Sequence, residues 1–89
     1  MPPPAGFRDA VVSEIRQISP FPPATIGDGD DLRVKLGLTD DLKRSLASPF
    51  QRIARRFKDD ASVTMDDCTE LEKVKDAVDL VASKSGFEQ

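Results

Sequence analysis

Apolar side chains recur every third or fourth residue in three separate stretches of this chain. The first stretch consists of Phe7, Val11, Ile15 and Ile18. This spacing places one apolar stripe along a helix of 3.6 residues per turn. We predict a helix over about residues 7–18 that ends before Pro20, because proline cannot donate the backbone hydrogen bond that a continuing helix needs.

Residues 19–38 have no regular apolar period and contain three prolines and three glycines. A loop of this length is uncommon in a compact domain unless it has a role of its own. We therefore predict that the loop is held to the core by three apolar anchors. These anchors are Ile26, Leu32 and Leu36.

The second apolar stripe falls within residues 39–58. It consists of Leu42, Leu46, Phe50, Ile53 and Phe57. Thr39 is a suitable N-cap for this helix. Pro49 interrupts the run, which predicts either one kinked helix or two helices split near Ala47. Ser48 and Pro49 form a good pair of N-cap and first helical residue for the second piece.

Two capping signals precede the third stripe. Thr64 and Asp67 fit a capping box for one short helical turn, and Thr69 and Glu72 fit a second box. The third stripe consists of Leu71, Val74, Val78 and Val81. Gly86 is placed to end this helix with a left-handed cap. Because no segment alternates as a strand would, we predict an all-α bundle of three main helices and a short one, with a long first loop.

The length of 89 residues fits one domain. We expect a helical domain over residues 7–85, between a flexible segment at 1–6 and a tail at 86–89. The chain has no His and one Cys, which removes the commonest general base and any internal disulfide or thiolate zinc site. We expect no metal and no catalysis. With no long apolar run or basic leader visible, we expect a cytoplasmic protein with no membrane partner.

Charge is distributed unevenly along the chain. Residues 39–58 contain six basic and two acidic side chains, whereas residues 59–89 contain three basic and nine acidic ones. Such a separation predicts surface patches that select partners. The pI near 4.8 and the absence of Tyr and Trp argue against a nucleic acid as the partner.

The order of these predicted elements resembles that of the acyl carrier protein family. The loop carries the sharpest match, because Ile26, Leu32 and the pair Leu36–Gly37 follow the spacing of the family's first loop. Residues 71–78 are similar to the family's fourth helix. The resemblance covers about residues 7–83. It implies a carrier that presents an acyl group as a thioester, on a phosphopantetheine arm, to dedicated enzymes.

The residue that carries the arm in that family has a different counterpart here. In the family an Asp-Ser-Leu motif follows the Leu-Gly pair, and its serine hydroxyl bears phosphopantetheine. With one residue inserted after Gly37, Asp41 stands at the serine position, and a carboxylate cannot form that phosphodiester. Ser45 is the candidate for a displaced attachment site; the alternative is that it is an ordinary helical serine.

The second helix also differs from the family in charge. In the family it is acidic and docks on basic patches of its enzymes. Here it carries Lys43, Arg44, Arg52, Arg55 and Arg56, and like charges would repel such partners. Two hypotheses follow. The chain is a carrier modified at Ser45, with carrier-modifying or acyl-handling enzymes as partners, or it is an unmodified carrier fold that binds a protein with an acidic patch through this basic helix.

Overall fold

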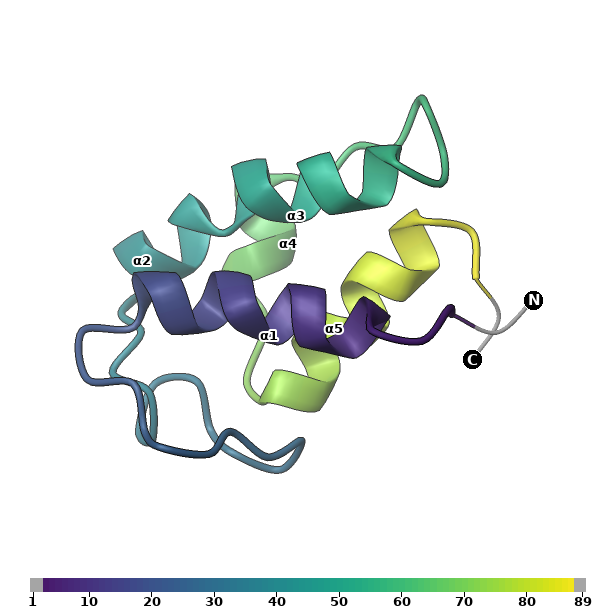
Figure 1. Ribbon diagram of the computed structural model, residues 1–89. Coiled ribbons are helices and arrows are strands. Elements are labelled where there is room, and N and C mark those ends of the chain that lie inside the picture. Colours follow the sequence, from purple (N-terminus) through teal and green to yellow (C-terminus); the bar gives the residue numbers. More distant parts are fainter. Residues whose placement is uncertain (1–2, 88–89) are drawn as a thin grey trace.

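The computed structural model describes residues 3–87, and this part of the chain folds into helices joined by loops (Figure 1). The all-α prediction is confirmed. An isolated antiparallel bridge between Asp31 and Lys73 is the one β-type pairing in the described part. The helices in chain order are α1 (Phe7–Ile18), α2 (Asp40–Ser45), α3 (Ala47–Arg55), α4 (Met65–Thr69) and α5 (Val74–Lys84).

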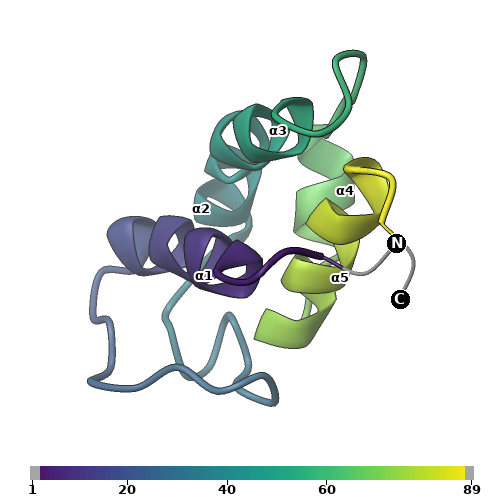
Figure 2. The ribbon, with the colours of Figure 1, turned by 45° about the vertical axis from the view of Figure 1, so that its right-hand side comes forward.

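Helix α1 has the bounds that its apolar stripe predicted, and it packs against both α3 and α5 (Figures 1 and 2). Its buried residues are Phe7, Val11, Val12 and Ile15. Fully buried side chains from the loop, from the junction of α2 and α3 and from α3 complete the core beneath it, among them Leu32, Leu36, Leu46 and Phe50. One continuous apolar core therefore joins α1 to the loop and to α3.

The long loop is held to the helices by its anchors and by hydrogen bonds. Leu32 and Leu36 are fully buried, and Ile26 packs against the core while partly exposed. The buried hydroxyl of Ser19 donates to the carbonyl of Leu36 over 2.6 Å, and Arg16 donates to the carbonyl of Pro23 over 2.8 Å. The prediction of three apolar anchors is confirmed.

The second helical region is split at Leu46, so of the two predicted alternatives, a kinked helix or a split near Ala47, the split is confirmed. Leu46 keeps right-handed helical angles, φ −73° and ψ −18°, and its N–H donates to the carbonyl of Lys43 over 3.0 Å. The predicted N-cap at Ser48 is wrong, because Ser48 already lies inside α3. Pro49 is the third residue of α3, where the N–H that it lacks would have no helical partner.

The capping box of Thr64 and Asp67 is confirmed, with both reciprocal bonds at 3.1 Å. The second predicted box, at Thr69 and Glu72, is wrong. Thr69 is the last residue of α4, and its hydroxyl donates to the carbonyl of Asp66. Helix α5 begins later, at Val74, because the Glu72 carbonyl accepts from the N–H of Leu32 over 2.8 Å. That bond holds the segment before α5 extended against the loop.

Gly86 ends α5 in the left-handed conformation, φ 87°, as predicted. The N–H of Gly86 donates to the carbonyl of Ser83, and the N–H of Phe87 donates to the carbonyl of Ala82. These two bonds form a Schellman motif. Phe87, which we assigned to the tail, packs against the core.

Candidate functional site

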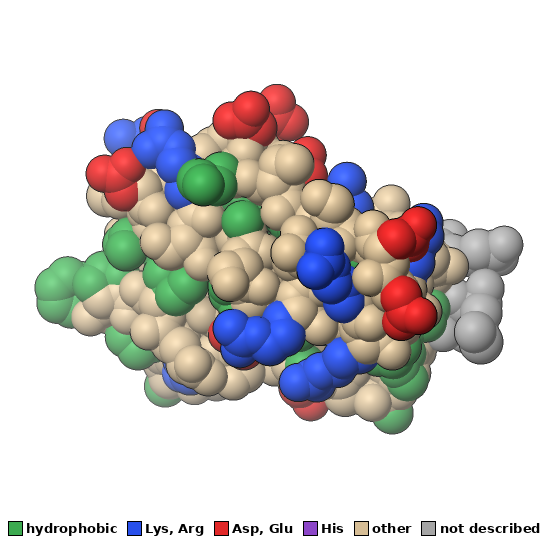
Figure 3. All heavy atoms as spheres, turned by 90° about the horizontal axis from the view of Figure 1, so that it is seen from above, with side chains coloured by type: hydrophobic (Ala, Val, Ile, Leu, Met, Phe, Trp, Pro, Cys, Tyr) green, Lys and Arg blue, Asp and Glu red, His purple; other side chains and the backbone are tan. Residues whose placement is uncertain are grey.

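Helix α3 presents exposed basic side chains on the side of the helix that faces away from the core. The basic face of α3 consists of Arg52 and Arg55 in the helix together with Arg56 and Lys58, which follow its last residue, and all four are exposed. Within residues 3–87, no carboxylate lies within ion-pair distance of any of these four side chains. Figure 3 looks onto this surface from above and shows basic side chains spread along it, with acidic ones toward its right-hand and upper edges.

Arg55 differs from its neighbours on the basic face because it also makes a structural contact. Its Nε donates to the carbonyl of Ala61 over 2.8 Å. This bond fastens the turn that follows α3, in which Asp59 and Asp60 are exposed. Arg52 and Arg56 lie one helical turn apart, and no such contact ties either side chain to the rest of the described chain.

The two basic residues predicted on α2 do not join this face. Arg44 pairs with Asp41 through Nη1 and Oδ1 at 2.6 Å, so its charge is locally balanced. Lys43 is buried, with 6% of its surface exposed. The sequence holds a signal for that burial, because Lys43 precedes Leu46 by three residues and Phe50 by seven. It therefore belongs to the same helical stripe as these two core side chains.

Ser45 is the last residue of α2 and is exposed. Its hydroxyl donates to the carbonyl of Asp41 in its own helix over 3.2 Å, and within the described residues it makes no hydrogen bond to a side chain. The carboxylate of Asp41 is 90% exposed and contacts Arg44. The structure thus places the hydroxyl and the carboxylate one turn apart on the surface of α2.

The described residues include no group of His, Cys, Asp and Glu side chains arranged to hold a metal ion. Cys68 is fully buried, and this burial, helped by the neighbouring charge of Asp67, raises the pKa of its thiol to about 11. The thiol therefore stays protonated at neutral pH, and a protonated, buried thiol is a poor nucleophile and a poor metal ligand.

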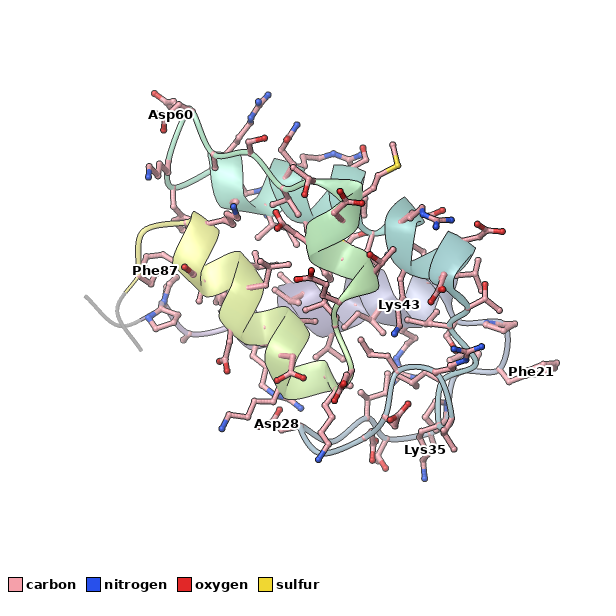
Figure 4. The ribbon with its side chains drawn as sticks, turned by 180° about the vertical axis from the view of Figure 1, so that it is seen from behind. Phe21, Asp28, Lys35, Lys43, Asp60 and Phe87 are labelled. Atoms are coloured by element: carbon pink, nitrogen blue, oxygen red, sulfur yellow. The ribbon has the colours of Figure 1, made fainter. Side chains whose placement is uncertain are left out.

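An open groove that the sequence did not predict lies between the first loop, α2 and the segment after α4. Its volume is about 590 Å³, within the range of small-ligand sites. The charged side chains that line it are Asp31, Arg33, Asp40, Lys43, Glu70 and Glu72. Figure 4 shows Lys43 in the interior of the view, whereas Phe21 and Asp60 project from its edges.

No family model, no curated protein and no solved structure matches this chain. Among residues 3–87, no helix combines the length and the apolar character that crossing a bilayer requires. Functional proposals for this protein therefore rest on its own side chains. Two surfaces and one hydroxyl stand out: the basic face of α3, the groove at Lys43, and Ser45.

Proposed function

We propose that this protein is a binding module that engages an acidic surface of a partner protein through the basic face of α3. The observation that carries this proposal is that Arg52, Arg56 and Lys58 are exposed without a carboxylate partner in the described chain. The planar guanidinium of arginine donates several hydrogen bonds and suits bidentate contact with carboxylates. Unpaired arginines on one face thus form a surface complementary to Asp and Glu side chains.

The support beneath this face favours binding with little rearrangement. Phe50, Ile53 and Ala54 are buried on the opposite side of α3, so the helix that carries the arginines is packed rigidly. A preorganised surface loses less conformational entropy on association. Complementary charges also steer the encounter, which makes the association rate sensitive to salt.

The double variant Arg52→Glu/Arg56→Glu tests the proposal. It leaves Arg55 in place because that side chain holds Ala61. The control Lys35→Glu/Lys75→Glu makes the same charge change at exposed residues of the loop and α5. We expect proteins captured from a lysate by the wild-type chain, and released by salt, to be retained by the control and lost by the double variant. Capture that is unchanged in the double variant would remove α3 from the proposal.

A second candidate function is the carrier activity that the family resemblance implies, with phosphopantetheine attached to Ser45. The observation that favours it is that the Ser45 hydroxyl is exposed and bonded to its own helix alone. It is thus free to become a phosphodiester, which the carboxylate of Asp41 cannot. Enzymes that use such a carrier would need acidic docking surfaces to meet the basic face of α3.

Intact-protein mass spectrometry decides this second candidate. The chain is incubated with coenzyme A and a phosphopantetheinyl transferase, and the mass of one attached arm is sought. A gain that is lost in Ser45→Ala and kept in Ser48→Ala, a change at another exposed serine, supports attachment at Ser45. No gain in the wild-type chain rejects the carrier activity and leaves the first proposal untouched.

A further inference from the structure

The groove at Lys43 contains an ammonium group without a direct partner, carried on a side chain that is mostly buried. Lys43 is more than nine-tenths buried and lines the groove. In the described chain its side chain makes no hydrogen bond or ion pair. No buried side-chain nitrogen in the described chain lacks a hydrogen-bond partner, so the unpartnered Nζ of Lys43 still reaches the open groove while its aliphatic stem is packed. The ammonium therefore has donors available to an acceptor that enters the groove.

Asp31, the groove carboxylate whose charge interacts with Lys43, does not fill this role. Its Oδ1 accepts from the backbone N–H groups of Arg33 and Val34, both at 2.9 Å. These two bonds, with a smaller contribution from the charge of Lys43, hold the pKa of Asp31 below its ordinary value. The carboxylate is thus ionised and fixed to its own turn, beyond ion-pair distance of the Lys43 ammonium.

The rest of the groove is acidic. Asp40, Glu70 and Glu72 add three exposed residues with carboxylates, against the single guanidinium of Arg33. This excess of negative charge opposes a ligand that is only anionic, such as inorganic phosphate. A ligand suited to the whole groove has one acceptor oxygen for Lys43 and positive charge for the surrounding carboxylates.

The walls of the groove are held together by backbone bonds. Leu32 donates to the carbonyl of Glu72 over 2.8 Å, and Val74 donates to the carbonyl of Asp30 over 3.0 Å. These bonds join the loop to the segment before α5, and α2 packs against α4 on the other side. The carboxylates and the ammonium are therefore carried on segments fixed relative to one another, which favours a specific ligand geometry.

We propose that this groove binds the C-terminal end of a basic peptide chain. The terminal carboxylate accepts a hydrogen bond from Nζ of Lys43, and the Lys or Arg side chains just before it meet Glu70 and Glu72. This site is separate from the basic face of α3 and opposite to it in charge, so it does not depend on the function proposed above. It gives the protein a second recognition surface with its own specificity.

Two fluorescent probes that differ at a single group test the site. Each is the tetrapeptide Gly-Ala-Arg-Lys labelled at its amino end, one with a free C-terminal carboxylate and the other with a carboxamide. Binding to the full chain is followed by fluorescence anisotropy. We expect the carboxylate probe to bind about tenfold more tightly, the effect of one charge-assisted hydrogen bond.

Three variants locate the effect. Lys43→Met should bring the two probes to equal affinity, and Glu70→Gln/Glu72→Gln should weaken both probes about equally. Asp59→Asn/Asp60→Asn removes the same charge in the turn after α3, far from Lys43 in Figure 4, and should leave both affinities unchanged. Equal affinity of the two probes for the wild-type chain overturns the proposal, and this comparison does not depend on whether Lys43→Met folds. An equal loss in the Asp59 and Asp60 control also overturns it, because binding would then follow overall charge.

Discussion

Phe87 lies edge-on against Phe7, with the ring centroids 5.3 Å apart and the ring planes at 87°. Phe57 completes the cluster, at 5.9 Å from Phe7 and 4.9 Å from Phe87. Edge-to-face geometry is the favoured arrangement of such rings. The three rings connect the start of α1, the residues after α3 and the residues after α5, so segments far apart in the sequence are joined at one end of the bundle.

We expect Phe87→Ala to lower the free energy of unfolding by about 2 kcal/mol, because it removes apolar burial together with two aromatic pairs. Urea denaturation followed by circular dichroism measures this change. Phe21→Ala is the matched control, since Phe21 is 82% exposed, and a change at a surface site should stay within about 0.5 kcal/mol. Equal effects of the two variants would contradict the role of the cluster.

The capping box at Thr64 gives a second prediction. Thr64→Ala removes the acceptor for the N–H of Asp67 and should destabilise the protein by about 1 kcal/mol, the usual effect of losing an N-cap. The same urea measurement applies. Thr25→Ala, at an exposed loop residue, should change stability little. A Thr64 variant as stable as the Thr25 control would show that the box does not hold α4.

The sequence predicts those parts of this fold that depend on local spacing. The apolar period of α1, the break before Ala47, the box at Thr64 and the left-handed Gly86 are all local features, and each is confirmed. The start of α5 depends instead on the bond between Leu32 and Glu72, a pairing across the chain that no window of sequence contains. The wrong capping box at Thr69 follows from that difference.

The candidate sites also divide into one that the local sequence predicts and one that depends on tertiary packing. Arg52, Arg55 and Arg56 share one helix, so their common face can be read from the spacing of the residues. The groove at Lys43 is built from three segments that are distant in the sequence, and only tertiary packing brings them together. The burial of Lys43 depends on that packing as well, although its register with Leu46 already indicates an inward position.

Asp67 gives a prediction about pH. The N–H of Thr64 lowers the pKa of Asp67 below its ordinary value of 3.8, and the hydroxyl of Thr64 and the charge of Lys84 add to the effect. A carboxyl group whose pKa is lower in the folded state adds stability above its unfolded pKa and loses that contribution as the pH falls through the folded pKa. We expect the free energy of unfolding to fall below about pH 4. This fall should be shallower in Asp67→Asn than in the wild-type chain. Identical dependence of the free energy of unfolding on pH in the two proteins would contradict the prediction.

Lys43→Met gives the last prediction, and its direction is opposite to that of most core substitutions. Lys43 is buried without an ion pair, so its ammonium is only partly compensated by Asp31 and by solvent in the groove. Methionine keeps a long unbranched side chain and removes a partly desolvated charge, a change that is often neutral or stabilising. We expect the variant to be more stable than the wild-type chain by about 1 kcal/mol in urea denaturation. Lys35→Met, at an exposed loop residue, is the control, and its free energy of unfolding should stay within about 0.5 kcal/mol of the wild-type value.

A Lys43→Met chain less stable than wild type would show that the ammonium has a compensating partner in the folded protein. A more stable chain that no longer distinguishes the two peptide probes would show that the charge of Lys43 is kept for binding at the expense of stability.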